Sequence, residues 1–508
     1  NVNIDLASQC VTPTTCQAGQ QVTITNNGAT AIAANPGSGV STWTTKSMTF
    51  GANSTASFTL NYPDVGAIRL NARHNIAGSG DYMSGVSNDF VVRPAGFVVN
   101  NIQRTADSVA NPGAADAAGA VFIKAGDSIT LTATAVIAQG NATPNYGQEV
   151  APEGVRLTTA LMPGLGLSNN PALGNATIAG GLFSAGSVTV TNVTWDEVGI
   201  ITITPGVGDS NYLGTGDVTG TATGNIGRFT PHHFDVSANA PVFATACTAG
   251  AFTYLGQPFN YAAGMEPVLT VTARNLTGGT TANYKGTTPA AQAFFKITNA
   301  SLTGKAYTAA SGTLDAGAVT APDPAIVAAG NGTGTLTFNS GSGLKFTRST
   351  PEVPFDAEIA LAINVIDADG VAYSTNPARF GQAGAGNGIA FSTGKDMRFG
   401  RLRLSGASGS QLLPLDVPFE AQYWTGTFFA TNTADTCTTV TGSNVVLGNS
   451  IGNLGINDTA ATVGALVAGR GEIRLSAPGA GNNGSLDLAI NLGTAANVAV
   501  CPAFTPAA

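Results

Sequence analysis

The fold of this chain is decided by residues 398–437, which read RFGRLRLSGASGSQLLPLDVPFEAQYWTGTFFATNTADTC. Arginine and leucine alternate at positions 401–404, and apolar and polar residues alternate again at 417–424. A period of two residues is typical of strands that are buried on one side. The glycine- and serine-rich segment 405–410 separates the two runs, as a loop between strands does. The stretch therefore predicts a sheet element and not a helix.

The same alternation continues through the rest of the chain, which shows no amphipathic helix of ordinary length. Residues 62–66 (YPDVG) resemble the tyrosine-corner turn of immunoglobulin-like sandwiches. A second copy of this landmark ends in Val198-Gly199, which lies 133 positions after Val65-Gly66. Repetition at this spacing predicts related domains in tandem. We predict an all-β protein with immunoglobulin-like β-sandwich domains, followed by a C-terminal β-rich domain, at residues 1–93, 94–228, 229–398 and 399–508.

Composition limits the classes of partner. The chain has 508 residues, of which only 10% are charged, and its net charge is -8 with a pI near 4.8. Nucleic-acid binding needs clustered Lys and Arg, so no nucleic-acid partner is expected. The sequence has no apolar run of about 18 residues or more, so no membrane-spanning helix is expected either. The chain starts at Asn1 without a methionine, which fits a processed export product.

The five cysteines have no CxxC spacing and no nearby histidine, so a zinc site is not expected. In an exported protein, Cys10 and Cys16 would form a local disulfide around Pro13. Cys437 and Cys501 flank the last predicted domain and are the second predicted pair. Cys247 is then left over as a buried thiol. The sequence leaves the pairing among these last three cysteines open.

Asp367 and Asp369 are the candidate metal ligands, because alternating carboxylates before Gly370 can place oxygen atoms around calcium. The bidentate glutamate of a complete calcium loop is missing. A turn between strands uses the same residue types, and we favour that alternative. No cofactor other than calcium is expected.

Trp424 is the candidate binding residue, since an exposed indole ring can stack on a sugar. The alternative is that Trp424 covers the next sheet or a domain interface, because large aromatic side chains are usually mostly buried. The sequence contains no nucleophile elbow, no phosphate-binding loop and no zinc-protease motif. We therefore predict a protein that is not an enzyme.

Val2, Ile4 and Leu6 alternate with polar residues at the start of the sequence. An extended segment of this kind can pair with the sheet edge of a neighbouring subunit. A strand within the chain's own first domain explains the pattern equally well. If the segment is donated, the chain would be the structural subunit of an extracellular filament or layer built by strand pairing between copies.

Several motifs together resemble one known family. In order, they are residues 228–234 (RFTPHHF), Cys247, 252–259 (FTYLGQPF), 272–275 (TARN), 283–286 (NYKG) and 398–437. They resemble the conserved C-terminal region of the MSHA biogenesis protein MshQ family, which belongs to the bacterial mannose-sensitive haemagglutinin type IV pilus system. The resemblance implies an exported cell-surface protein that is linked to a pilus and acts in adhesion. Its partners would be pilus or other surface proteins, further copies of itself, and a glycan receptor that the resemblance does not name.

Overall fold

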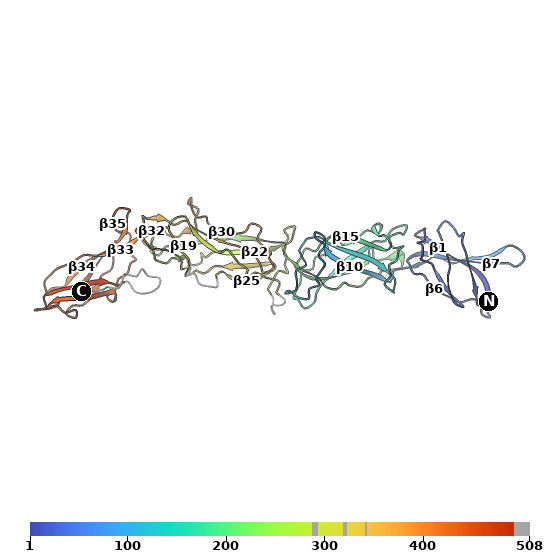
Figure 1. Ribbon diagram of the computed structural model, residues 1–508, viewed down its shortest axis with the longest axis horizontal. Coiled ribbons are helices and arrows are strands. Elements are labelled where there is room, and N and C mark those ends of the chain that lie inside the picture. The colour runs from blue at the N-terminus through green and yellow to red at the C-terminus, as the bar shows by residue number, and fades with distance from the viewer. Residues whose placement is uncertain (287–292, 318–322, 341–342, 492–508) are drawn as a thin grey trace. The chain divides into compact units, whose positions relative to one another are not determined.

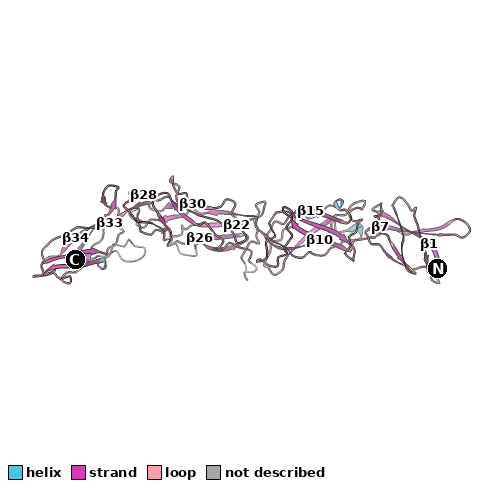
Figure 2. Ribbon diagram, in the orientation of Figure 1, coloured by secondary structure: helices cyan, strands magenta, loops and turns pink. Residues whose placement is uncertain are grey.

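A computed structural model describes residues 1–286, 293–317, 323–340 and 343–491. Strands and loops make up these ranges, and they contain no α-helix (Figure 2). Short 3-10 turns occur at Gly180–Leu182, Tyr212–Gly214 and Gly442–Asn444. Over the same ranges, no helix has the length and apolarity needed to cross a membrane. The predicted all-β class is confirmed.

The chain forms two compact units. The first contains Asn1–Phe234, Thr272–Lys296 and Ala328–Thr333, and the second contains Asp235–Val271, Ile297–Val327 and Gly334–Ala508. The first two sandwiches therefore belong to one unit, and the C-terminal domain belongs to the other. Figure 1 labels the strands along both units.

The first domain is an immunoglobulin-like sandwich of two sheets. Its larger sheet has the order β4-β1-β7-β8, with β5 beside β1 and β9 beside β7, and its smaller sheet has the order β3-β2-β6. Ile24, Ile32 and Ile68 are buried between the sheets. The strands are β1 (Val2–Thr12), β2 (Thr23–Thr25), β3 (Ala29–Ala31), β4 (Ala33–Asn35), β5 (Thr44–Met48), β6 (Thr59–Asn61), β7 (Gly66–Asn75), β8 (Tyr82–Val86) and β9 (Phe90–Val92).

The second domain packs a three-stranded sheet, β10-β12-β15, against a five-stranded sheet, β11-β17-β16-β13-β14. Its strands are β10 (Gly96–Arg104), β11 (Ile123–Lys124), β12 (Ile129–Val136), β13 (Val155–Leu161), β14 (Thr177–Ile178), β15 (Ser187–Val193), β16 (Gly199–Val207) and β17 (Ile226–Thr230).

Strands from residue 233 to residue 398 make several smaller sheets. In the second unit these include β21-β19-β31, β20-β32-β28, β23-β29-β30 and β24-β27. The strands are β18 (His233–Ala238), β19 (Val242–Ala244), β20 (Phe252–Tyr254), β21 (Asn260–Tyr261), β22 (Val268–Arg274), β23 (Ala306–Ala309), β24 (Leu314–Asp315), β25 (Ala325–Gly330), β26 (Thr333–Thr337), β27 (Lys345–Phe346), β28 (Phe355–Asp356), β29 (Ile359–Ile363), β30 (Ala378–Phe380), β31 (Ala390–Phe391) and β32 (Asp396–Arg398).

The C-terminal domain contains the two strands that the opening stretch predicts. They are β33 (Gly400–Leu404) and β34 (Leu415–Trp424), which pair antiparallel in the sheet β33-β34-β38-β37, with β35 beside β34. Val417, Phe419 and Ala421 are buried on one face of β34, as the alternation requires. The remaining strands are β35 (Phe429–Thr431), β36 (Val445–Gly452), β37 (Ala461–Val463), β38 (Arg470–Leu475) and β39 (Gly484–Ile490), of which β36 and β39 form a second sheet.

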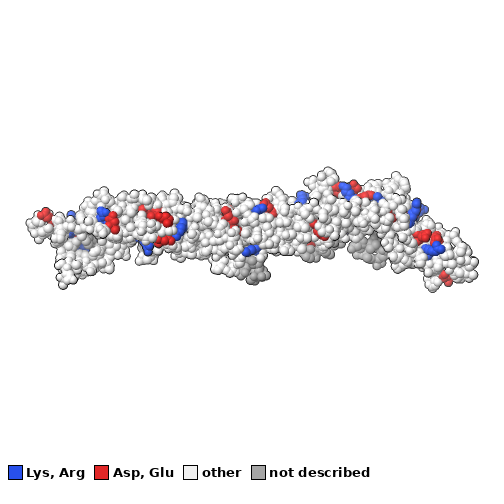
Figure 3. Space-filling view, turned by 180° about the vertical axis from the view of Figure 1, so that it is seen from behind, with Lys and Arg blue, Asp and Glu red and all other residues white. Residues whose placement is uncertain are grey.

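The surface reflects the low charge of the sequence. On the face drawn in Figure 3, Lys, Arg, Asp and Glu form small separate groups among uncharged residues. Several of these charges are paired at the surface, as Arg69 is with Asp89 and Arg474 with Asp416. Exposed ion pairs of this kind contribute little to stability.

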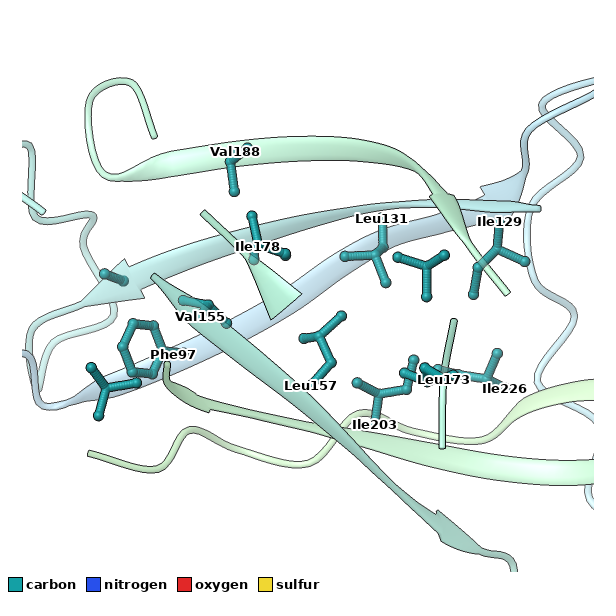
Figure 4. Close-up of a cluster of buried hydrophobic side chains, with 14 of the residues drawn as sticks. Phe97, Ile129, Leu131, Val155, Leu157, Leu173, Ile178, Val188, Ile203 and Ile226 are labelled. Atoms are coloured by element: carbon teal, nitrogen blue, oxygen red, sulfur yellow. The ribbon is translucent and has the colours of Figure 1, made fainter. Parts of the chain in front are cut away.

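Apolar burial is extensive in the second domain. Figure 4 shows Phe97, Ile129 and Leu131 on one side of its core, with Val155, Leu157 and Ile203 opposite them. None of these side chains is more than 3% exposed. Complete burial of one such side chain contributes about 1.5–3 kcal/mol. Trp195 also lies in this core, and its ring meets that of Phe229 edge-on at 5.0 Å.

Candidate functional site

The structure confirms one predicted disulfide and replaces the other. Cys10 and Cys16 are bonded, as their spacing predicted. Cys437 is bonded to Cys247 and not to Cys501, because the segments after β19 and β35 bring these two Cα atoms to 5.6 Å, a normal disulfide separation. Cys247 is therefore buried in a disulfide and is not a leftover thiol. Cys501 lies outside the described residues.

Asp367 is part of a turn between strands. Its carboxylate Oδ1 accepts hydrogen bonds from the backbone N of Asp369 and of Val371, each at 2.9 Å. Gly370 has a φ of +79°, a conformation that suits glycine. Within the described ranges, no group of three or more His, Cys, Asp or Glu residues is arranged to hold a metal ion. These contacts support the turn alternative over the calcium site.

Trp424 is half-buried at the end of β34. Its ring centroid lies 5.1 Å from that of Phe429, and its backbone N donates to Phe399 O at 2.9 Å. The guanidinium of Arg401 lies 3.7 Å above the Phe429 ring. The indole is therefore one member of a packed group of aromatic rings, and its partner Phe429 lies on β35 of the same sheet.

Val2, Ile4 and Leu6 belong to β1, a strand of the chain's own first domain. Residues 2–6 pair with β5, and the strand pairs with β7 from Asp5 onward. Ile4 and Leu6 pack against the domain core. The structure therefore assigns this segment to its own sheet and not to a neighbouring subunit, because its hydrogen-bonding groups are already used there.

The YPDVG landmark forms the junction between the first two domains. Val65 is fully buried and lies in the core of the second domain. Asp64 Oδ1 accepts hydrogen bonds from Val65 N at 2.9 Å and Asn145 N at 3.0 Å. Asn145 Nδ2 in turn donates to Tyr62 OH at 2.7 Å and to Val65 O at 3.0 Å. A Cβ atom at Gly66 would lie 2.3 Å from Thr12 O, so the turn requires glycine.

The second copy of the landmark repeats these contacts. Glu197 Oε1 accepts from Val198 N at 2.8 Å and from Asn283 N at 3.0 Å, and Asn283 Nδ2 donates to Val198 O at 3.1 Å. Glu197 thus corresponds to Asp64, and Asn283 corresponds to Asn145. Burial raises the pKa of both carboxyl groups, and that of Asp64 rises to about 6. Both partners stand in an Asn-Tyr dipeptide, at 145–146 and 283–284, but the same dipeptide occurs at 61–62, 211–212 and 260–261, so it does not identify them.

A third cluster of buried polar groups lies in the second unit, where Tyr254 meets the C-terminal domain. Tyr254 OH donates to Asp435 Oδ2 at 2.9 Å and accepts from Asn432 Nδ2 at 2.7 Å. Asn432 and Asp435 are fully buried. The Cys247–Cys437 disulfide joins the same two parts of the chain. Buried asparagine and carboxylate groups therefore recur where consecutive domains meet.

The C-terminal domain contains a cavity of about 700 Å³. Apolar side chains from both of its sheets line it, among them Leu404, Leu475 and Leu486, together with Ser405 and Asn482. Asp487 is the acidic residue in this lining, and its Oδ2 accepts from Asn449 Nδ2 at 2.8 Å. A single carboxylate of this kind does not provide the pair that glycoside hydrolysis requires.

The outward face of the larger sheet in the first domain is the most distinctive surface, and we call it the polar face. It carries the aligned row Thr45, Asp5, Arg73 and Ser84 from β5, β1, β7 and β8. Residues two positions along each strand share this face, namely Asn3, Ser47, Asn75 and Tyr82.

Arg73 lies between two aromatic rings on the polar face. Its guanidinium carbon is 4.4 Å from the Trp43 ring centroid and 4.2 Å from that of Tyr82. Asp5 accepts from Arg73 Nε at 3.0 Å, and Thr45 donates to Asp5 at 2.6 Å. The sequence analysis missed this group because its members come from distant positions, and only their alternation with apolar residues hints that they share a face.

These features define an all-β multidomain protein whose first domain is immunoglobulin-like. In sequence comparisons, models of the four DUF6701 domains match the chain in order. The first, described as the Ig-like domain of a domain of unknown function, matches residues 1–86, and the second, third and fourth match 93–196, 197–388 and 398–500. The chain therefore belongs to the DUF6701 family. The comparison with curated proteins gave no match.

Proposed function

We propose that this chain is a non-catalytic, exported bacterial cell-surface protein that is associated with a pilus and acts in adhesion. The disulfides Cys10–Cys16 and Cys247–Cys437 carry the first part of the proposal. Disulfides persist in oxidising compartments and are rare in the cytosol. Two bridges in one all-β chain therefore support an extracellular location.

The pilus link comes from the resemblance of residues 228–286 and 398–437 to the MshQ family. The match to four DUF6701 domains in order is consistent with a larger family that includes such proteins. It does not identify MshQ as the relative. Adhesion is favoured over catalysis because the first domain offers an exposed polar face with aromatic rings. Buried junctions such as Asp64–Asn145 suit a protein that must hold consecutive domains together under load.

The test is made in the native bacterium. Deletion of the coding sequence should reduce attachment of cells to a surface, and protease added to intact cells should digest the chain. The C247S/C437S double variant is compared with the wild-type chain. It lacks the bridge between these two cysteines, so we expect less of it to be recovered at the cell surface. Recovery of the chain only from the cytoplasm, or unchanged attachment of the deletion strain, would overturn the proposal.

A structural subunit of an extracellular filament or layer is the second candidate, and one observation favours it. The strand β8 is an edge strand that pairs with β7, and all five of its residues are exposed. It has no Lys or Pro of the kind that protects sheet edges, and Met83 is 68% exposed. Electron microscopy of the purified chain at rising concentration tests this candidate. Regular filaments would support it, whereas single particles at every concentration would exclude it.

A further inference from the structure

The polar face combines exposed hydrogen-bonding groups with little net charge. Asn3, Thr45, Ser47, Asn75 and Ser84 are all exposed. The charges of Asp5 and Arg73 neutralise each other, because their side chains form an ion pair at 3.0 Å. Amide and hydroxyl groups can both donate and accept hydrogen bonds. The face therefore matches a ligand that carries many hydroxyl groups and no charge.

The aromatic rings on this face are held in place before any ligand arrives. Arg73 is fixed by Asp5 and packs between the rings of Trp43 and Tyr82. Contacts between a guanidinium and an aromatic ring are attractive, so they restrain both rings. Tyr82 is nevertheless 45% exposed, so part of its ring remains available to a ligand. Fixed aromatic rings lose little conformational entropy on binding.

One group on this face lacks a partner. Asn71 lies two residues before Arg73 in β7 and so shares the polar face. Its Nδ2 is buried, and it has no hydrogen-bond partner among the described residues. A buried amide donor without a partner costs free energy. Because the protein encloses this atom, a ligand on the polar face does not reach it without a local movement, so Asn71 is not one of the binding groups.

We propose that the polar face of the first domain binds a neutral polysaccharide chain. This inference rests on the proposed adhesive function and specifies its ligand class and its site. Pyranose rings offer hydroxyl groups to Asn75 and Ser84 and an apolar face to Tyr82. The strands beneath are about 4.8 Å apart, which is comparable to the length of one sugar ring, so successive units can lie across successive strands. An open sheet surface suits an extended chain better than a small enclosed molecule.

A second protein as the ligand is less well supported. Protein interfaces have a central apolar or aromatic anchor that becomes fully buried. The exposed residues of the polar face are mainly Asn, Ser and Thr, and Val86, which pairs with Asn71, is the exposed aliphatic residue on it. The exposed Met83 points to the opposite side of β8. Met83 therefore provides a matched control on the same strand.

The test is isothermal titration of the full chain with cellohexaose, mannohexaose and maltohexaose. We expect at least one of these neutral oligosaccharides to bind, with a Kd that changes less than about twofold between low and high salt. Y82A should weaken that binding by about tenfold or more, Y82F should retain it, and M83A should stay within about twofold of the wild type. Circular dichroism should show that all variants keep the fold.

Three results would overturn the inference. The first is no binding of any of the three oligosaccharides at millimolar concentration. The second is an equal loss of affinity in Y82A and M83A. The third is binding of heparin alone, abolished by salt. Each result can occur while the deletion strain still loses attachment, so failure of this inference is distinguishable from failure of the adhesive function.

Discussion

Asp64 is a residue at which pH acts directly on the fold. It is fully buried, and burial raises the pKa of its carboxyl group from 3.8 to about 6. Between these values the folded chain binds more protons than the unfolded chain, so the free energy of unfolding falls as pH rises. The stabilising contribution of the protonated Asp64 carboxyl group to the free energy of unfolding is fully present below about pH 4. It is lost as the pH rises through about 6. It is at most about 3 kcal/mol, because one pKa unit corresponds to about 1.4 kcal/mol.

The D64N variant tests this account. Asparagine keeps an oxygen that can accept from Val65 N and Asn145 N but carries no charge. The Tm of the first unit should therefore differ less between about pH 4.5 and about pH 7.5 in D64N than in the wild type. D89N is the control, because Asp89 is exposed and pairs with Arg69 at the surface. A pH dependence in D64N equal to that of the wild type would contradict the prediction.

The sequence predicted part of this junction at the level of single residues. Aligning Val65-Gly66 with Val198-Gly199 correctly identified two equivalent turns, because glycine and carboxylate residues suit such turns locally. It did not identify Asn145 or Asn283, which lie 80 and 85 positions after Val65 and Val198. Partners across a domain junction leave no periodic pattern, and the Asn-Tyr dipeptide that they share does not single them out, because it also occurs at 61–62, 211–212 and 260–261.

The turn between β6 and β7 acts as an element that joins two cores. Val65 lies at its tip and is fully buried in the core of the second domain. V65A removes two methyl groups and leaves a cavity, which we expect to cost about 2 kcal/mol. Scanning calorimetry should show the first domain of V65A unfolding separately from the second. V86A, at an exposed position of β8, should leave the transition unchanged, and a single unaltered transition in V65A would disprove the coupling.

The disulfide Cys247–Cys437 links two elements that are 190 positions apart. Loss of a disulfide typically costs about 2–4 kcal/mol, so C247S/C437S should lower the Tm of the second unit. Peptide mapping of the non-reduced wild type should recover a cross-linked pair that contains these two cysteines. C501S should leave that pair intact. Recovery of a peptide that joins Cys437 to Cys501 would restore the pairing predicted from sequence and exclude the one described here.

Elements were easier to predict than the surfaces they form. Alternation predicted β33 and β34 well, because the buried side of a strand is specified by its own residues. Alternation could not decide whether residues 2–6 pair within the chain's own first domain or with a neighbouring subunit, because both arrangements bury the same side chains. The polar face was not predicted, because Thr45, Asp5, Arg73 and Ser84 become neighbours only when four strands pair in register.

At the scale of the whole molecule, stability depends mainly on apolar burial and on hydrogen bonds, including those to buried carboxylates, and little on exposed ion pairs. Only 10% of residues are charged. Many of the ion pairs are exposed, such as that between Arg474 and Asp416, whose side chains are 54% and 44% exposed. Exposed pairs contribute about 0–1 kcal/mol and are weakened by salt. In the second domain a large apolar cluster is buried, and the buried Glu149 accepts a hydrogen bond from Tyr212 OH at 2.8 Å.

Sodium chloride and sodium sulfate should therefore affect the chain differently. Raising NaCl from about 0.02 M to about 0.5 M screens ion pairs and should change the Tm of either unit by less than about 2 °C, since about 1 kcal/mol shifts the Tm by about 2–4 °C at this domain size. Sulfate at the same ionic strength strengthens apolar burial and should raise the Tm. Calorimetry in both salts measures this difference. A Tm that falls by more than about 5 °C in NaCl would mean that exposed ion pairs, and not apolar burial and buried hydrogen bonds, hold the domains together.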